Sequence, residues 1–307
     1  MMNADYQKVI SKVYAEILTQ ENIGKVPDYI PEIACIEENK FGVNYTDLND
    51  NSFGCGDFQE KFSIQSISKV FALSYVYEEL GEKLWKRVDV EPSGNPFNSL
   101  LQLEADHGIP RNPFINAGAL VICDILLEIC DKPKEKMLEF IRNLAEDDEI
   151  FFNEKVAQSE MENSFRNTAM CNFMKSFGNI HERPTAVIDL YCHLCSIEMT
   201  CEQLSKSFLY LANGGKKPSD NTSVLPFLKG KRINAILLTC GFYDESGEFS
   251  FLVGLPGKSG VGGGIIAILP QKYCIAVWSP KLNPKGNSYR GTKFLEKFTT
   301  LTGETIF

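Results

Sequence analysis

The chain has 307 residues, of which 44% are hydrophobic and 23% charged, with a formal net charge of −9. This composition is typical of a soluble globular protein large enough to bury a sizeable core. The sequence has no basic run interleaved with aromatic residues, so we expect no nucleic-acid partner. Its apolar runs are shorter than the roughly 18–20 residues that cross a bilayer, so we expect no membrane association.

The start of the chain and its cysteines favour a cytoplasmic protein. Residues 1–8 lack a basic region followed by an apolar core, which is unlike a signal peptide. The ten cysteines are scattered and are expected to be reduced thiols. Cys192 and Cys195 have the spacing of half a zinc site, but no second Cys-x-x-Cys pair completes it, so we expect no metal.

The first part of the chain predicts a helix followed by a strand hairpin. Apolar residues at helical spacing predict a helix over residues 4–20, and the two prolines within residues 24–31 end it. Residues 33–37 and 41–46 are rich in strand formers and flank a polar turn, which predicts a hairpin. The Gly/Asn/Asp-rich residues 49–57 are expected to form a loop.

A long helical block follows, and then the period changes to that of strands. Helices are predicted over residues 67–77, 112–130, 134–145, 154–161, 163–176, 184–196, 201–213, 226–239 and 290–301, and antiparallel strands over 249–255, 261–269 and 272–278. This order predicts an α/β fold of the α+β type, with an antiparallel sheet flanked by helices. We expect residues 1–61 and 202–307 to form the α/β lobe, residues 62–201 an inserted all-helical lobe, and the active site to lie between them.

The first candidate for chemistry is a Ser-x-x-Lys pattern. On a helix Ser66 and Lys69 lie about one turn apart on one face. A desolvated, neutral lysine can take the proton of a serine and make it a nucleophile. The helix N-terminus favours developing negative charge. The pattern alone also fits a plain N-cap and a solvated lysine, and Ser63 and Ser68 are competing hydroxyls.

The second candidate is the glycine-rich stretch over residues 254–264. Glycines let the backbone approach a ligand closely and aim its N–H groups at it, although an ordinary hairpin turn with a bulge has the same composition. Within it, Lys258, Ser259 and Gly260 precede a predicted strand. Together with Ser-x-x-Lys, this resembles the Lys-Thr/Ser-Gly element of serine β-lactamases and penicillin-binding proteins, in the same chain order.

A wider set of motifs resembles the serine-dependent glutaminase family. The matching segments, between about residues 24 and 290, are Tyr29-Ile30-Pro31, Gln65-Ser66-Ile67-Ser68-Lys69, Glu91-Pro92-Ser93-Gly94-Asn95-Pro96-Phe97-Asn98-Ser99, Pro113-Phe114-Ile115-Asn116-Ala117-Gly118-Ala119, Arg166-Asn167, Met174-Lys175-Ser176-Phe177-Gly178-Asn179 and Pro256-Gly257-Lys258-Ser259-Gly260-Val261-Gly262-Gly263-Gly264. Each segment alone is weak evidence, but the whole set is highly specific.

The resemblance implies hydrolysis of L-glutamine to L-glutamate and ammonia through a γ-glutamyl-serine acyl-enzyme, in a β-lactamase-like fold, by a homo-oligomer (dimer or tetramer) without a cofactor. It implies Ser66 as nucleophile, Lys69 as base, and the backbone N–H groups of Ser66 and Val261 as the oxyanion hole. Tyr191 and Tyr243 are the implied proton carriers near the serine. The implied substrate-binding residues are Tyr29, Gln65, Ser66, Asn116, Glu160, Asn167, Tyr191, Tyr243 and Val261.

These residue types suit an amino-acid amide. A carboxylate at Glu160 can hold an α-ammonium, and Asn116 and Asn167 can donate to an α-carboxylate. A tyrosine near a lysine can relay a proton. Each residue also has an ordinary explanation: Tyr191 as a core residue and Glu160 as a solvated helix residue. Asn116 also fits a helix cap, and Gln65 a residue that orients the ligands from behind the pocket.

One position departs from the family, and other sites are disfavoured. Phe173 stands where some members have a tyrosine, and a phenyl ring cannot donate a hydrogen bond, so we leave it out of the site. His107, His181 and His193 lie outside the matched segments, which disfavours a Ser-His-Asp triad. No Gly-x-Gly-x-x-Gly or P-loop motif predicts a nucleotide cofactor. The alternatives are a penicillin- or peptide-acylated serine enzyme and a non-catalytic glutamine sensor.

Overall fold

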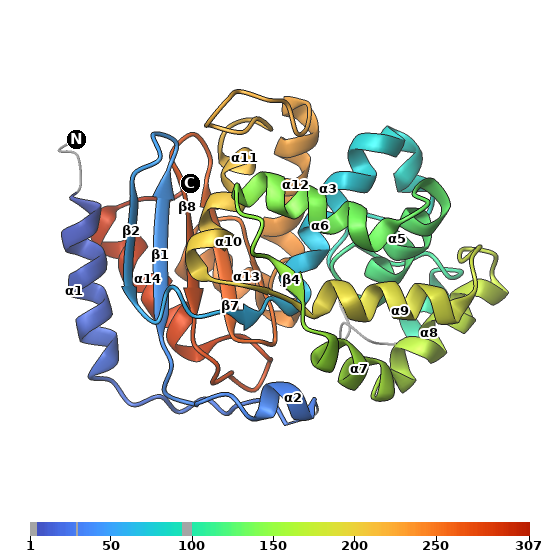
Figure 1. The fold of residues 1–307 in the computed structure, drawn as a ribbon, viewed down its shortest axis with the longest axis horizontal. Helices are drawn as coiled ribbons and strands as arrows, with labels where there is room; N and C mark the ends of the chain where they lie inside the picture. The colour runs from blue at the N-terminus through green and yellow to red at the C-terminus, as the bar shows by residue number, and fades with distance from the viewer. Residues whose placement is uncertain (1–4, 29, 94–99) are drawn as a thin grey trace.

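The computed structural model describes residues 5–28, 30–93 and 100–307 (Figure 1). The strands are β1 (Gly42–Asp47), β2 (Ser52–Gly56), β3 (Phe62–Ser63), β4 (Phe151–Phe152), β5 (Ile197–Met199), β6 (Gly257–Ser259), β7 (Gly264–Leu269) and β8 (Tyr273–Trp278). The helices are α1 (Tyr6–Leu18), α2 (Pro31–Ala34), α3 (Ser68–Leu80), α4 (Leu100–Ala105), α5 (Asn116–Ile129), α6 (Pro133–Ala145), α7 (Glu154–Glu162), α8 (Phe165–Ser176), α9 (Pro184–Cys195), α10 (Cys201–Ser207), α11 (Leu209–Ala212), α12 (Phe227–Cys240), α13 (Ser246–Leu252) and α14 (Tyr289–Thr302). Short 3-10 turns are η1 (Gln65–Ile67), η2 (Gly81–Lys86) and η3 (Tyr243–Glu245).

The main sheet is built from both ends of the chain. In the described residues it has five strands in the order β2-β1-β8-β7-β6, and every neighbouring pair is antiparallel. Strand β1, from the N-terminal part, pairs with β8, from the C-terminal part, with Gly42 opposite Trp278 and Asp47 opposite Tyr273. The sheet therefore has the antiparallel, both-ends architecture that the order of predicted elements indicated.

The two faces of this sheet belong to different hydrophobic cores. Side chains alternate along a strand, so on β7 Ile265 and Ala267 face the core shared with α1 and α14. Ile266 and Ile268 face the opposite core, which continues into α3, α5 and α9. Figure 1 shows α1 and α14 on one side of the sheet, and α3, α5 and α9 on the other. No helix in the described ranges is both long and apolar enough to cross a membrane.

A small second sheet anchors the segment that carries the predicted nucleophile. Strand β5 lies between β3 and β4, with Phe62 opposite Met199. Beyond the strand, the backbone N–H of Ile64 donates to the carbonyl of Ile197 at 2.9 Å, and Ser63 Oγ donates to the carbonyl of Cys195 at 2.9 Å. The end of α9 therefore holds η1 and the start of α3 in place.

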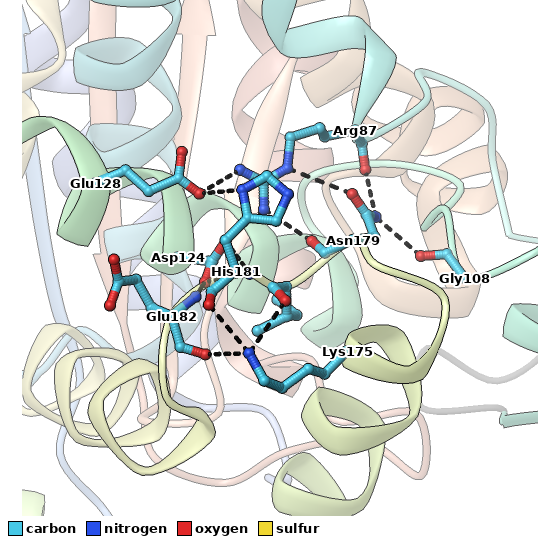
Figure 2. Close-up of polar contacts among 9 residues, drawn as sticks. Arg87, Gly108, Asp124, Glu128, Lys175, Asn179, His181 and Glu182 are labelled. Atoms are coloured by element: carbon cyan, nitrogen blue, oxygen red, sulfur yellow. Dashed lines mark hydrogen bonds and ion pairs between the residues drawn. The ribbon is translucent and has the colours of Figure 1, made fainter.

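A buried ion-pair network joins the helices farthest from the sheet (Figure 2). The guanidinium of Arg87 pairs with the fully buried carboxylate of Asp124 on α5, and with Glu128 at 2.8 Å. Asp124 also accepts from the backbone N–H groups of His181 and Glu182, at distances down to 2.8 Å. A buried carboxylate is tolerated when charge and donors surround it, so this network fixes the loop after α8 against α5.

Most predicted helices are confirmed within a few residues, and the predicted strand over residues 41–46 is confirmed as β1, but its predicted hairpin partner is wrong. Residues 33–37, predicted as a strand, overlap helix α2, which Pro31 begins with its fixed φ. The true partner of β1 is β2, inside the predicted loop 49–57. The carboxylate of Asp47 closes their turn by accepting from the N–H groups of Asn49 at 2.8 Å and Asn51 at 3.0 Å.

The late part of the chain holds a second error. Residues 249–255, predicted as a strand, lie mostly in helix α13, where the Phe249 ring stacks on Phe242 with centroids 3.5 Å apart. Ser250 Oγ donates to the Ser246 carbonyl one turn earlier at 2.8 Å. A short apolar run fits either period, and packing decided for the helix. The strand that pairs with β7 is instead β6, inside the glycine-rich stretch over residues 254–264.

Candidate active site

Ser66 lies in a strained turn between β3 and α3. Its side chain is buried, as are those of its neighbours. Gln65 has φ of 50°, in the left-handed region that non-glycine residues rarely adopt. Ser68 Oγ donates to the Gln65 carbonyl at 2.8 Å, and Gln65 Nε2 donates to Ser63 Oγ at 3.0 Å. Such strain persists only where the surroundings hold it, and it is common at functional sites.

Lys69 is a buried amine and not a solvated one. Its side chain is 4% exposed, and Nζ donates to the Phe114 carbonyl at 3.2 Å and to Asn116 Oδ1 at 2.7 Å. Burial lowers the pKa of Lys69 to about 8. Both hydrogen bonds of Lys69 Nζ thus point to α5 and the segment before it. Within the described residues, Ser66 is not among the hydrogen-bond partners of Lys69. A neutral amine has two N–H groups and one lone pair, so both acceptors together leave the lone pair available.

The glycine-rich turn packs directly on the Ser66 segment. A Cβ on Gly262 would lie 2.1 Å from the Ser63 carbonyl oxygen, and one on Gly260 would lie 2.4 Å from that of Ile64. The indole N–H of Trp278 donates to the Gly262 carbonyl at 3.0 Å and fixes the turn from the sheet side. Only glycine permits this approach, which the glycine-rich composition predicted.

Tyr243 and Lys258 complete this side of the site. Burial raises the pKa of Tyr243, and the nearby Ser66 side chain and Val261 backbone act in the opposite direction. Lys258 Nζ lies 4.7 Å from the centroid of the Tyr243 ring and donates to the Ser259 carbonyl at 2.6 Å. Burial, followed by the charge of Lys69, lowers the pKa of Lys258 well below its usual value. The site therefore holds two buried amines.

Polar groups from α5, α7 and α8 reach the same region. Asn116 Oδ1 accepts from Lys69, and its Nδ2 donates to Asn167 Oδ1 at 3.1 Å. Asn116 therefore does not act as a side-chain helix cap, which had been an alternative. Burial raises the pKa of Glu160 to about 7, opposed by a hydrogen bond from Gln65 and the charge of Lys69. Glu160 is thus a half-buried carboxyl group beside Lys69.

Tyr191 and Cys195 close the site from helix α9. The Tyr191 ring centroid lies 5.7 Å from Lys69 Nζ, and the side chain is 5% exposed. Burial raises the pKa of Tyr191, and burial raises the pKa of Cys195 to about 12. Cys192 and Cys195, the two cysteines of the half-zinc spacing, lie on α9 as buried free thiols.

The structure thus brings together Ser66, Lys69, Gln65, Asn116, Glu160, Asn167, Tyr191, Tyr243 and Val261. Tyr29 lies outside the described residues. Sequence reasoning gave no role to Lys258 or to the Phe114 carbonyl. The position of Lys258 in the Lys-Ser-Gly motif could have indicated a role in the site, whereas the sequence carries no pattern that marks the backbone carbonyl of Phe114.

Other titratable clusters lie outside this site. Asp124, Glu128 and His181 have potential metal-ligand atoms within 4.8 Å of one another. The Arg87 guanidinium, however, already forms ion pairs with both carboxylates (Figure 2). His193 Nδ1 contacts the Asp189 carbonyl at 2.7 Å. We therefore read these clusters as structural networks.

Comparison with known proteins gives one family. A family model named Glutaminase matches residues 24–307. The glutaminase of Christiangramia forsetii is 52% identical over 303 residues, covering 99% of this chain and 100% of that one. The glutaminase of Saccharophagus degradans is 51% identical over 303 residues, covering 99% of each.

Solved structures agree. The probable glutaminase ybaS matches with a TM-score of 0.93 at 31% identity, covering 100% of this chain and 99% of that one. Mglu in its glutamate form matches with a TM-score of 0.92 at 28% identity, covering 100% of this chain and 70% of that one. The predicted β-lactamase-like fold class is confirmed. The chain belongs to the serine-dependent glutaminase family.

Proposed function

We propose that this chain hydrolyses L-glutamine to L-glutamate and ammonia through a γ-glutamyl ester on Ser66. Membership of a family of glutamine amide hydrolases supports the overall reaction. The observation that carries the mechanism is the buried Lys69 amine, whose N–H groups donate to Phe114 and Asn116. That arrangement keeps a lone pair for the proton of Ser66, one helical turn away.

Acylation begins with proton transfer from Ser66 Oγ to Lys69 Nζ as the oxygen attacks the γ-carbonyl carbon. The carbonyl electron pair moves to its oxygen, and the backbone N–H groups of Ser66 and Val261 stabilise that charge. The C–N bond then breaks as the amide nitrogen takes a proton and leaves as ammonia. Tyr243, whose hydroxyl is influenced by the Ser66 side chain, delivers this proton and regains one from Lys69.

Deacylation repeats these roles with water. Lys69, neutral again, takes a proton from water as the oxygen attacks the ester carbon. The ester bond breaks, Ser66 Oγ recovers its proton, and glutamate leaves. The ammonia and the glutamate together account for every atom of glutamine and one water.

The amino-acid end of the substrate is held by the helical segments. Glu160 as a carboxylate pairs with the α-ammonium. Asn167 Oδ1 accepts a hydrogen bond from Asn116 Nδ2. The Asn167 Nδ2 group therefore points away from Asn116, and it donates to the α-carboxylate of the substrate. Tyr29, Gln65, Asn116 and Tyr191 are the further pocket residues of this proposal.

The wider setting is also part of the proposal. Residues 1–61 and 202–307 form the α/β lobe and residues 62–201 the helical lobe, with the site between them. We propose a cytoplasmic homo-oligomer, dimer or tetramer, that works without a cofactor. Size measurement in solution tests the assembly.

The test of the nucleophile is ammonia release from glutamine, with asparagine run beside it. The wild-type chain releases ammonia from glutamine, and Ser66→Ala lowers this rate at least about 1,000-fold, because the ester cannot form. Ser74→Ala is the matched control, since Ser74 is a buried serine on α3, the helix that follows Ser66, and its hydroxyl contacts Tyr210 at 2.7 Å. The control keeps its turnover and loses only about 1 kcal/mol of stability. Full turnover by folded Ser66→Ala would remove Ser66 as the nucleophile.

A further inference from the structure

The backbone of Tyr243 is held in an unfavourable conformation. Its φ is 48°, in the left-handed region, although tyrosine carries a bulky side chain. Tyr243 begins η3, and the turn is closed by hydrogen bonds from Phe242 N–H to Ser246 Oγ at 3.0 Å and from Glu245 N–H to the Phe242 carbonyl at 2.8 Å. Strain of this kind requires neighbouring structure to maintain it.

Glu245, at the other end of η3, accepts hydrogen bonds from the loop before α14. Asn283 Nδ2 donates to Glu245 Oε1 at 3.0 Å and to Oε2 at 2.8 Å, and Asn287 Nδ2 donates to Oε2. Lys285 Nζ lies 3.7 Å from Oε1, and the Glu245 side chain is only 14% exposed. One carboxylate thus collects donors from three positions of the loop.

The loop is itself rigid at these points. Asn283 Oδ1 accepts from the backbone N–H groups of Lys285 and Asn287, each at 3.0 Å. The N–H of Asn283 donates to the Asn287 carbonyl at 2.8 Å, and that of Gly286 donates to the Asn283 carbonyl at 3.0 Å. Residues 283–287 therefore form a closed turn with both asparagine amides aimed at Glu245.

This closed turn packs against two residues of the proposed catalytic centre, Tyr243 and Val261. A Cβ on Gly286 would lie 3.8 Å from Tyr243 Cε2 and 3.9 Å from Val261 Cγ1. The turn therefore packs against the Tyr243 ring and against Val261, the residue proposed to supply a backbone N–H to the oxyanion. Glu245 joins the backbone of that tyrosine to this turn.

We propose that Glu245 is a positioning residue, which clamps η3 to residues 283–287 and so holds the Tyr243 hydroxyl on Ser66. The inference rests on the proposed function, in which Tyr243 carries a proton to the leaving nitrogen. Glu245 itself touches no reacting atom. Its effect on the rate therefore passes through the Tyr243 hydroxyl, and this separates it from a general stabilising role.

The test is a double-mutant cycle between Glu245→Ala and Tyr243→Phe, with kcat and KM for glutamine measured for each. Releasing the clamp displaces the hydroxyl, so Glu245→Ala lowers kcat about 10- to 100-fold and changes KM less than about threefold. In the Tyr243→Phe background the same change has little further effect on kcat. Glu245→Gln keeps one acceptor oxygen and recovers part of the kcat, and it serves as the readout where the alanine variant does not fold.

Glu248→Ala is the matched control. Glu248 also pairs with Lys285, at 3.5 Å, but its side chain is 60% exposed and makes no such clamp. This variant keeps the wild-type kcat. A wild-type kcat for folded Glu245→Ala, or losses that multiply with Tyr243→Phe, overturns the clamp. A wild-type kcat for Tyr243→Phe overturns the proposed role of Tyr243, and the clamp inference falls with it.

Discussion

At the scale of single residues, burial sets the protonation states that the chemistry needs. Lys69 and Glu160 lie in the same buried region, and desolvation disfavours the charged form of each. The amine is therefore neutral at a lower pH than an exposed lysine, which suits a base. The carboxyl group ionises at a higher pH than an exposed glutamate, which couples substrate binding to pH.

The pH profile of kcat/KM follows from these two groups. Burial lowers the pKa of Lys69 to about 8 and raises that of Glu160 to about 7, and both must lose a proton for activity. As pH falls, kcat/KM drops first as Lys69 gains a proton and then more steeply as Glu160 does. The profile of kcat follows Lys69 alone, because the bound α-ammonium keeps Glu160 ionised. Initial rates across this range check it, and a kcat/KM unchanged from about pH 9 down to about pH 6 would contradict it.

At the scale of elements, the site depends on two turns pressed together. The 3-10 turn η1 carries Ser66, and the turn between β6 and β7 carries Val261. They touch through backbone atoms at Gly260 and Gly262, where no side chain fits. The proposed oxyanion hole therefore depends on how the edge of the sheet meets the start of α3.

Gly262→Ala tests this contact. Its Cβ would lie 2.1 Å from the Ser63 carbonyl oxygen, so the two turns must separate. We expect a loss of about 3 kcal/mol of stability and a kcat at least about 100-fold lower in the protein that remains folded. Thermal unfolding and glutamine turnover measure the two effects.

Gly247→Ala is the matched control for Gly262→Ala. Gly247 lies in α13, and a Cβ there meets nothing within 4 Å. This variant keeps its kcat and gains about 0.5–1 kcal/mol of stability, as expected for alanine in place of a helical glycine. Equal behaviour of the two variants would show that the close approach at Gly262 has no role.

At the scale of the whole molecule, distant parts of the chain meet at one site. Ser66, Lys69 and Asn116 come from the first half of the chain, whereas Tyr243 and Val261 come from its last quarter. The antiparallel pairing of β1 with β8 brings the ends together (Figure 1). The Arg87–Asp124 network holds the helices on the far side of the site (Figure 2).

Motifs and long periodic segments were the predictable part of this architecture. The helices over residues 134–145 and 184–196 are confirmed because their patterns are long, whereas residues 249–255 are too short for the period to decide. Among the residues of the matched motifs, Lys69, Asn116 and Asn167 are joined by hydrogen bonds in the structure, and their roles stay a proposal. The tertiary contacts could not be predicted from the sequence, because they join residues that are distant along the chain. Examples are the hydrogen bonds of Lys69 to two acceptors, and those of Glu245 from Asn283 and Asn287.

The proposed mechanism depends above all on a γ-glutamyl ester that forms on Ser66. Acid quenching of the enzyme during turnover of glutamine, followed by digestion and mass spectrometry, tests it most directly. We expect one added glutamyl group on the peptide that contains Ser66, and none on that peptide in Ser66→Ala. Turnover of glutamine with the adduct on another residue, or an adduct that persists in Ser66→Ala, would contradict it.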